Sequence, residues 1–194
     1  ETKVTISGNA FTYNGTAQGP TAVVTDPDDN PIEGAEVTLL YMGTTSMGER
    51  YMSATAPTNA GSYTVIAAYA GDATHDCAAA VARFTIAKAD VSITVNDATV
   101  TYNGAAQGLT ATATIADGAI DVSDQLVMRY GGKDAEPTDA GTYKSFAIFP
   151  GNGNINGTSA PATLTIASRP VTITPQATFS PSREPLFAEI GRAS

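Results

Sequence analysis

The stretch TYNGTAQG at residues 12–19 recurs as TYNGAAQG at residues 101–108, at an offset of 89 residues. A second pair of stretches, PTNAGSY at 57–63 and PTDAGTY at 137–143, matches at an offset of 80. Self-similarity at a fixed period of this kind indicates that one structural unit is repeated along the chain. The sequence therefore predicts two copies of a module about 80 to 90 residues long.

The drop in the offset locates the difference between the copies. The first copy carries nine extra residues, all between Gly43 and Pro57. We place the modules at residues 1–88 and 89–168. Residues 169–194 are either a C-terminal tail or the opening of a truncated third module, which we prefer because VTIT at 171–174 matches VSIT at 91–94. The last segment also holds prolines that restrict it to short or edge strands: Pro175, Pro181 and Pro185.

Each copy consists of short apolar or alternating stretches separated by turn residues. Examples are SYTVIAAY at 62–69 and RFTI at 83–86, and the turns include Asn14-Gly15 and Asn103-Gly104. Such stretches predict strands, and six or seven strands in one module indicate a β-sandwich. Two helical turns fit residues 122–129, but the matching segment of the first copy favours a strand. We expect an all-β chain of tandem immunoglobulin-like β-sandwich modules arranged end to end.

Tyr63 and Tyr143 end the two matching stretches. Their spacing is typical of a tyrosine corner, in which the tyrosine hydroxyl bonds to backbone a few residues upstream in immunoglobulin-like domains. The positions two residues later hold Val65 and Ser145, and the chain has no Trp. An antibody-type disulfide with its packing partner is thereby excluded, which leaves a generic sandwich.

The combined pattern resembles the tandem bacterial immunoglobulin-like repeats known as MBG domains. It consists of YNGxAQG, then PTxAGxY, a Gly-Asp or Gly-Asn loop and a closing Phe/Leu-Thr-Ile-Ala, and it covers roughly residues 1–174. The resemblance implies a spacer or stalk role in an adhesin-like protein, located outside the cell at the bacterial surface. It carries over no catalytic residue.

Composition excludes several other classes. The chain of 194 residues has 10 basic and 19 acidic side chains, a net charge of -9, so we expect no nucleic-acid partner. The sequence has no run of 18 apolar residues, and its first residues lack the pattern of a signal peptide. We expect a soluble fragment without membrane insertion, with any targeting segment outside it. One Cys and one His exclude an internal disulfide and a zinc site with several histidines. We expect no cofactor and no metal.

Two loops hold residue types found in reactive or metal sites. His75 and Cys77 lie near Asp72 and Asp76, but the second copy has Ile155 and Gly157 at the corresponding positions, so we interpret this loop as solvated. The segment Asp26–Asn30 with Glu33 has alternating oxygen donors, as calcium loops do. Pro31 stands where such a loop requires Gly, so we interpret the segment as a polar turn and keep calcium as an alternative.

Covalent crosslinks between side chains are a further alternative, of the ester or isopeptide kind that surface adhesins use. The candidates are Gln18, Gln107, Lys3 and Lys88. Lys88 is replaced by Ser168 at the next junction, and the closing strands contain no Asn. We expect each Gln to bond backbone near its turn instead.

The nine-residue insertion predicts an extended hairpin over residues 44–56 with its turn at Met47-Gly48-Glu49. Its apolar side chains, with Met42 on the preceding strand, either pack on the module or form a surface for a partner or a neighbouring module. The residues of this candidate contact surface are Met42, Met47, Tyr51 and Met52.

The function we expect is a non-enzymatic spacer whose partners are the neighbouring modules of the same chain. The alternative is a module that binds glycan or host protein through its loops or the 44–56 hairpin. The junction at residues 86–91 lacks Gly and Pro, so the modules should touch. We expect contact of Asn14-Gly15 or the 71–77 loop with the 96–98 turn.

Overall fold

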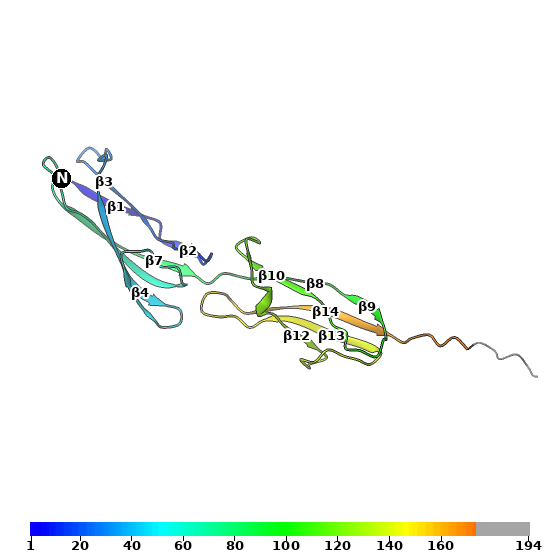
Figure 1. The fold of residues 1–194 in the computed structure, drawn as a ribbon. Helices are drawn as coiled ribbons and strands as arrows, with labels where there is room; N and C mark the ends of the chain where they lie inside the picture. Colours follow the sequence, from blue (N-terminus) through cyan, green and yellow to red (C-terminus); the bar gives the residue numbers. More distant parts are fainter. Residues whose placement is uncertain (174–194) are drawn as a thin grey trace, which may run out of the picture.

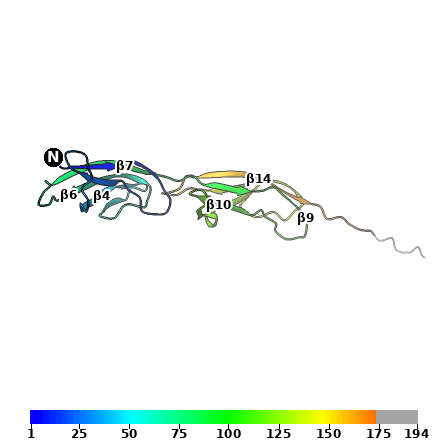
Figure 2. The same ribbon diagram turned by 90° about the horizontal axis from the view of Figure 1, so that it is seen from above.

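The computed structural model describes residues 1–173 and shows two β-sandwiches placed end to end (Figures 1 and 2). The N-terminus lies at one end of the elongated chain, and the second module leads to the other end. Within the described part, the regular structure is strand except for one short 3-10 helix, and no helix is long and apolar enough to cross a membrane.

The first module consists of two sheets formed within residues 1–88. One sheet pairs β1 with β3 in antiparallel register, and the other has the order β2-β7-β6-β4-β5, with β2 parallel to β7. The strands are β1 Lys3–Ser7, β2 Ala10–Thr12, β3 Thr21–Thr25, β4 Val37–Thr45, β5 Arg50–Ser53, β6 Gly61–Tyr69 and β7 Ala78–Ala87.

The second module repeats most of this topology, with β11 added to its small sheet and no counterpart of β5 in its large sheet. The small sheet has the order β11-β10-β8 and the large one the order β12-β13-β14-β9, with β9 parallel to β14. Its elements are β8 Ser92–Val95, β9 Ala98–Thr101, β10 Ala111–Ile115, β11 Ile120–Asp121, η1 Ser123–Gln125, β12 Val127–Tyr130, β13 Gly141–Phe149 and β14 Thr158–Ala167. Of the ambiguous segment 122–129, the 3-10 turn η1 takes the first half and β12 the second.

Two local features of the backbone explain the glycines of the repeated YNGxAQG stretch. Its Gly adopts a left-handed backbone in both copies, with φ of +78° at Gly15 and +80° at Gly104, which Gly does without strain. Its last Gly lies under a buried tyrosine ring: a Cβ at Gly19 would come 2.8 Å from the ring of Tyr41. The motif therefore marks a turn followed by a close approach of backbone to the core.

Each sandwich buries its own core between its two sheets. In the first module, Phe84 stacks on Tyr63 with ring centroids 5.4 Å apart and meets Tyr41 edge-on. In the second, Leu164 and Ile166 of β14 are buried beside Tyr130. Burial of large aromatic and aliphatic side chains supplies most of the favourable free energy of folding in small domains. Each module therefore has a hydrophobic core of its own on which it can fold.

The last described residues leave the second module without joining a sheet. Val171 and Ile173 are each 84% exposed, whereas the matching Val91 and Ile93 pack against the core of the second module. The predicted third module or tail falls mainly on residues 174–194, which lie outside the described residues.

Candidate functional site: the junction between the modules

The most specific contacts between the modules are made by the loop that joins β13 to β14. We call residues 151–157 the docking loop. Its shape is fixed from within, because Oδ1 of Asn152 accepts hydrogen bonds from the backbone N–H of Asn154 (2.8 Å) and of Ile155 (2.9 Å). Gly151 supplies the left-handed backbone at its start, with φ of +81°. An ordered loop of this kind can present side chains without a large loss of entropy on docking.

Asn154 carries the docking loop into the first module. Its Oδ1 accepts a hydrogen bond from the backbone N–H of Ala60 at 2.9 Å, and its Nδ2 donates to Oδ1 of Asn59 at 3.0 Å. Ala60 is 1% exposed, so this N–H has no access to water. The amide of Asn offers one acceptor and two donors in a fixed geometry, and both kinds are used here.

The hairpin made by β4 and β5 closes over the same loop. The hydroxyl of Ser46 donates to the backbone carbonyl of Gly153, and the backbone N–H of Ser46 donates to the carbonyl of Ala60 at 2.8 Å. Met47 covers Gly153 so closely that a Cβ there would lie 2.5 Å from Met47 Cγ. The insertion of the first copy therefore contacts the docking loop of the second module.

Three further contacts lie on other sides of the junction. Tyr13 packs against the core cluster of each module, and Gly15 lies near Ile120, where an added Cβ would come 3.1 Å from Ile120 Cδ1. In the connecting segment, Nζ of Lys88 donates to the carbonyl of Asn152 at 2.8 Å. The interface therefore combines apolar packing with hydrogen bonds from three separate segments of the first module.

The structure corrects our prediction of which loops meet. Gly15 does reach the second module, but its partner is Ile120, not the 96–98 turn. That turn lies at the far end, because Ala98 pairs with Leu164 in β14. The 71–77 loop is also remote, since β6 starts beside Ile86, at the end of β7 that leads to the junction, and ends beside Ala78 at the other end of the module. The predicted contact of the 71–77 loop is therefore wrong, and residues 151–157, the second copy of that loop, contact the first module instead.

The predicted contact residues do not form a single surface. Met47 lies at the hairpin turn against Gly153, as described above. Tyr51 points into the module and meets the ring of Tyr63 edge-on, with centroids 5.8 Å apart. Met42 and Met52 are paired across β4 and β5 on the outer face of the large sheet, where Met52 is 73% exposed. The hairpin contributes to the core, the junction and the outer face.

Tyr63 and Tyr143 occupy matching places at the starts of β6 and β13. The hydroxyl of Tyr63 donates to the carbonyl of Asn59, and that of Tyr143 donates to the carbonyl of Asp139, both at 2.8 Å. Burial raises the pKa of the Tyr63 hydroxyl. This bond fixes the backbone of Asn59 in the segment that receives Asn154.

The 71–77 loop repeats the docking loop at the opposite end of the first module. Oδ1 of Asp72 takes the place of the Asn152 amide oxygen and accepts from the N–H of Thr74 (2.7 Å) and of His75 (2.8 Å). The His75 imidazole, 2.9 Å from Asp72 Oδ2, with the Thr74 N–H and the Tyr69 hydroxyl, holds the pKa of Asp72 well below its usual range. Cys77 is exposed. The carboxylate thus serves to order its own loop.

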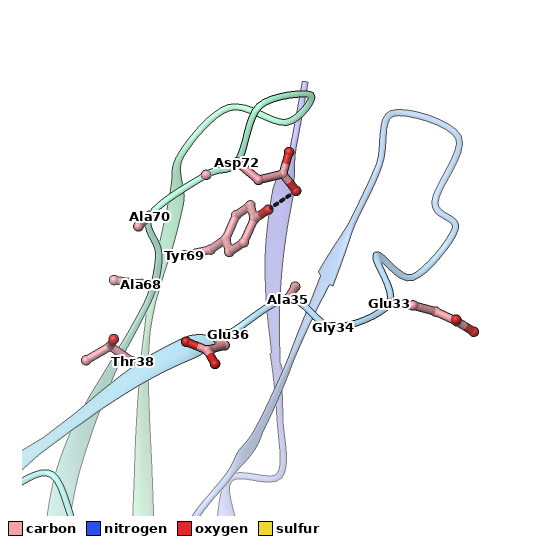
Figure 3. A pocket seen from close by; sticks show the side chains of 10 residues that line it. Glu33, Gly34, Ala35, Glu36, Thr38, Ala68, Tyr69, Ala70 and Asp72 are labelled. Carbon is pink, nitrogen blue, oxygen red and sulfur yellow. Dashed lines mark hydrogen bonds between the residues drawn. The ribbon is translucent and has the colours of Figure 1, made fainter.

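A shallow hollow lies beside this loop, between β4 and β6 (Figure 3). Asp72 is bonded there to the Tyr69 hydroxyl at 2.7 Å, while the Glu33 side chain points away from that pair. At the candidate calcium loop, Oδ1 of Asp26 accepts from the N–H of Asp28 and of Asn30, both at 2.9 Å. Across residues 1–173, no three acidic, His or Cys side chains are grouped so that they could hold a metal ion.

Of the residues weighed for crosslinking, Gln107 and Lys88 make side-chain hydrogen bonds to backbone carbonyls. The side-chain oxygens of Gln18 and Gln107 are buried without a hydrogen-bond partner, so the predicted side-chain bond to backbone is seen for Gln107 and not for Gln18. Nε2 of Gln107 donates to the backbone carbonyl of Thr101 at 3.3 Å, beside its own turn. The backbone N–H groups of Gln18 and Gln107 donate to the carbonyls of Pro57 and Pro137, which ties the YNGxAQG stretch to the PTxAGxY stretch in both modules. Lys88 bonds the docking loop, as described above.

Fold, repeat and junction define a tandem of immunoglobulin-like β-sandwich modules. The sequence model of the MBG domain matches residues 2–90 and again residues 91–170, and the chain belongs to this family. Among solved structures, the chain is similar to one described as fibronectin(III)-like modules of Clostridium thermocellum CbhA, with 18% identity over 85% of this chain and 94% of that one. The TM-score of that match is 0.31. No curated protein matches the chain.

Proposed function

We propose that this chain is a non-enzymatic spacer in a bacterial cell-surface, adhesin-like protein, and that it holds a functional region away from the surface. The observation that supports this most is the docked junction, because Asn154, Ser46 and Lys88 bind one module to the other. A spacer keeps its two ends at a set distance only if the junctions between its modules resist bending. A junction held by contacts on several sides resists bending.

The alternative is a binding module that recognises glycan or host protein through its loops or the 44–56 hairpin. Met47, at the turn of that hairpin, is engaged with Gly153, and Tyr51 is packed inside. Glycan-binding surfaces generally combine aromatic platforms with converging polar groups, whereas the hollow of Figure 3 is lined by Tyr69 turned toward Asp72. These placements favour the spacer.

Two experiments test the proposal. On arrays of glycans and of extracellular host proteins, the full chain should give no specific signal; dose-dependent binding to one component would favour the alternative. Antibodies raised against the chain should label intact cells of the bacterium that produces it. Labelling only after permeabilisation would contradict the surface location.

A further inference from the structure

The outer face of the large sheet in the first module carries a contiguous apolar surface. In a strand, alternate residues share a face, so the outward series on β4 includes Leu40 and Met42. Leu40 is paired with Ile66 and Ile66 with Val81, which gives one row across three strands. Val81 is 65% exposed and Met52, beside Met42, is 73% exposed. We call Leu40, Ile66 and Val81 the apolar row. Met42 and Met52 lie beside this row on the same face.

Opposite charges stand at the two ends of this face. Glu36 continues the outward series of β4 on one side of Leu40, and its side chain lies beside Thr38 (Figure 3). On the other side, Arg50 is paired with Thr44, at the same number of residues from Leu40 as Glu36. Within β2, β4, β5, β6 and β7 the charged side chains are Arg50 and Arg83 alone, although the whole chain is acidic.

The two end charges, Glu36 and Arg50, are complementary across a two-fold axis. Consider a two-fold axis that runs along the apolar row, perpendicular to the strands. Each residue of the row would then face the same residue of the second chain. Glu36 of one chain would lie near Arg50 of the other. Arg83 lies on the same outer face, two residues from Val81, and the same axis would place it over Ala79 of the second copy. Symmetric dimers use such self-complementary patches, in which residue i meets j and j meets i. We infer that the outer face of the first module binds a second copy of this chain, face to face and with strands antiparallel.

The size of the face sets the strength of the contact. Three strands of nine or ten residues, each about 30 Å long, and the four-residue β5 lie about 4.8 Å apart and together provide on the order of 500 Å² per copy. Specific stable interfaces average about 800 Å² per partner, so the contact belongs to the weak, reversible class. The inference goes beyond the proposed spacer role and does not depend on it.

The second module provides a control within the same chain. Its row is Arg129, Phe146 and Pro161, with Phe146 41% exposed. The position that matches Glu36 is the uncharged Gln125, and Arg129 is already paired with Asp134 at 2.7 Å. This face is partly apolar but lacks the opposite charges at its ends.

Sedimentation equilibrium of the full chain with the Cys77→Ser change, at about 0.15 M salt, tests the inference. We expect a concentration-dependent dimer that Val81→Lys weakens by about tenfold or more, whereas Phe146→Lys leaves it within about twofold. Both side chains are exposed, so neither change disturbs a core. A monomer at all concentrations, or equal effects of the two variants, would overturn the inference.

Charge variants test the geometry. Glu36→Arg makes both ends of the face basic, and Arg50→Glu makes both ends acidic, so each variant alone should dimerise less than the parent chain. Mixed in equal amounts, the two variants should form a heterodimer, because each supplies the charges that the other lacks. If the mixture sediments as the sum of its components, the proposed pairing is wrong.

Discussion

Asn154 of the second module donates a hydrogen bond from Nδ2 to Oδ1 of Asn59 of the first, at 3.0 Å across the junction. The same side chain accepts from the N–H of Ala60. The Asn154 side chain thus bonds a side chain of the first module, that of Asn59, and a backbone group of the first module, the N–H of Ala60. The corresponding residue of the first module, Thr74, instead donates its hydroxyl to Asp72 within its own loop, at 2.8 Å.

Asn154→Ala should uncouple the modules. The change removes both hydrogen bonds and leaves the N–H of Ala60 without its partner, at a cost of about 1–3 kcal/mol in the free energy of unfolding. In urea denaturation of the full chain, we expect the transitions of the two modules to separate. Thr74→Ala is the matched control, because it trims the same loop position away from the junction. Equal separation in both variants would show that Asn154 has no special role.

The fit of Met47 over Gly153 can be tested by a double-mutant cycle. Gly153→Ala forces the Met47 side chain aside, because the new Cβ would lie 2.5 Å from its Cγ. Combining Gly153→Ala with Met47→Ala removes the clash, so the double variant should be more stable than the sum of the single effects predicts, by on the order of 1 kcal/mol. Additive changes in urea denaturation would mean that the two residues do not interact.

Tyr63→Phe and Tyr143→Phe each remove one hydroxyl donor. We expect each to destabilise its own module by on the order of 1 kcal/mol, the usual net value of such a hydrogen bond. Tyr63→Phe should also loosen the junction, because its acceptor belongs to Asn59. Thermal unfolding followed by near-UV circular dichroism measures both effects. Unchanged melting curves for both variants would count against a stabilising role of this bond.

The Asp72 carboxylate should make the first module sensitive to acid. Its pKa is lower in the folded than in the unfolded chain, where it is near 3.8, so its contribution is present above about pH 4 and is lost as the pH falls below that value. Asp72→Asn should lower the melting temperature at pH 7, and the difference from the parent should shrink toward pH 2. Asp76→Asn removes a charge from the same loop and serves as control. A difference that stays constant with pH would exclude this linkage.

The repeat made the fold predictable, but not the junction. Comparing the copies identified what both need, such as the turn at Gly15 and Gly104 and the tyrosines at 63 and 143. The contact between the modules depends on residues that the copies do not share: Asn154 corresponds to Thr74, and Met47 lies in the insertion. A comparison that looks for residues shared by the two copies does not detect residues that occur in one copy alone. Only the placement of the 151–157 loop against Asn59 and Ala60 reveals their use.

The predicted strands were easier to assign than their partners. Alternation marked β6 and β7 because their apolar residues face the core, and these two strands pair along their full length. The parallel pairing of β2 with β7 had no signal in the sequence, since Ala10–Thr12 is short and meets its partner from a distant part of the chain. Local patterns indicate which face of a strand is buried, whereas edge pairing is decided by the packing of the whole module.

The central claim, a junction that holds the modules in one orientation, is tested most directly by electron paramagnetic resonance distance measurements. One spin label goes on the native Cys77 and the other on Lys144→Cys, both exposed. At about 3.3 Å per strand residue, we predict one narrow distance peak in the range of roughly 50–60 Å, which broadens in Asn154→Ala. A broad distribution in the otherwise unaltered chain, or a peak at much shorter distance, would contradict a rigid end-to-end spacer.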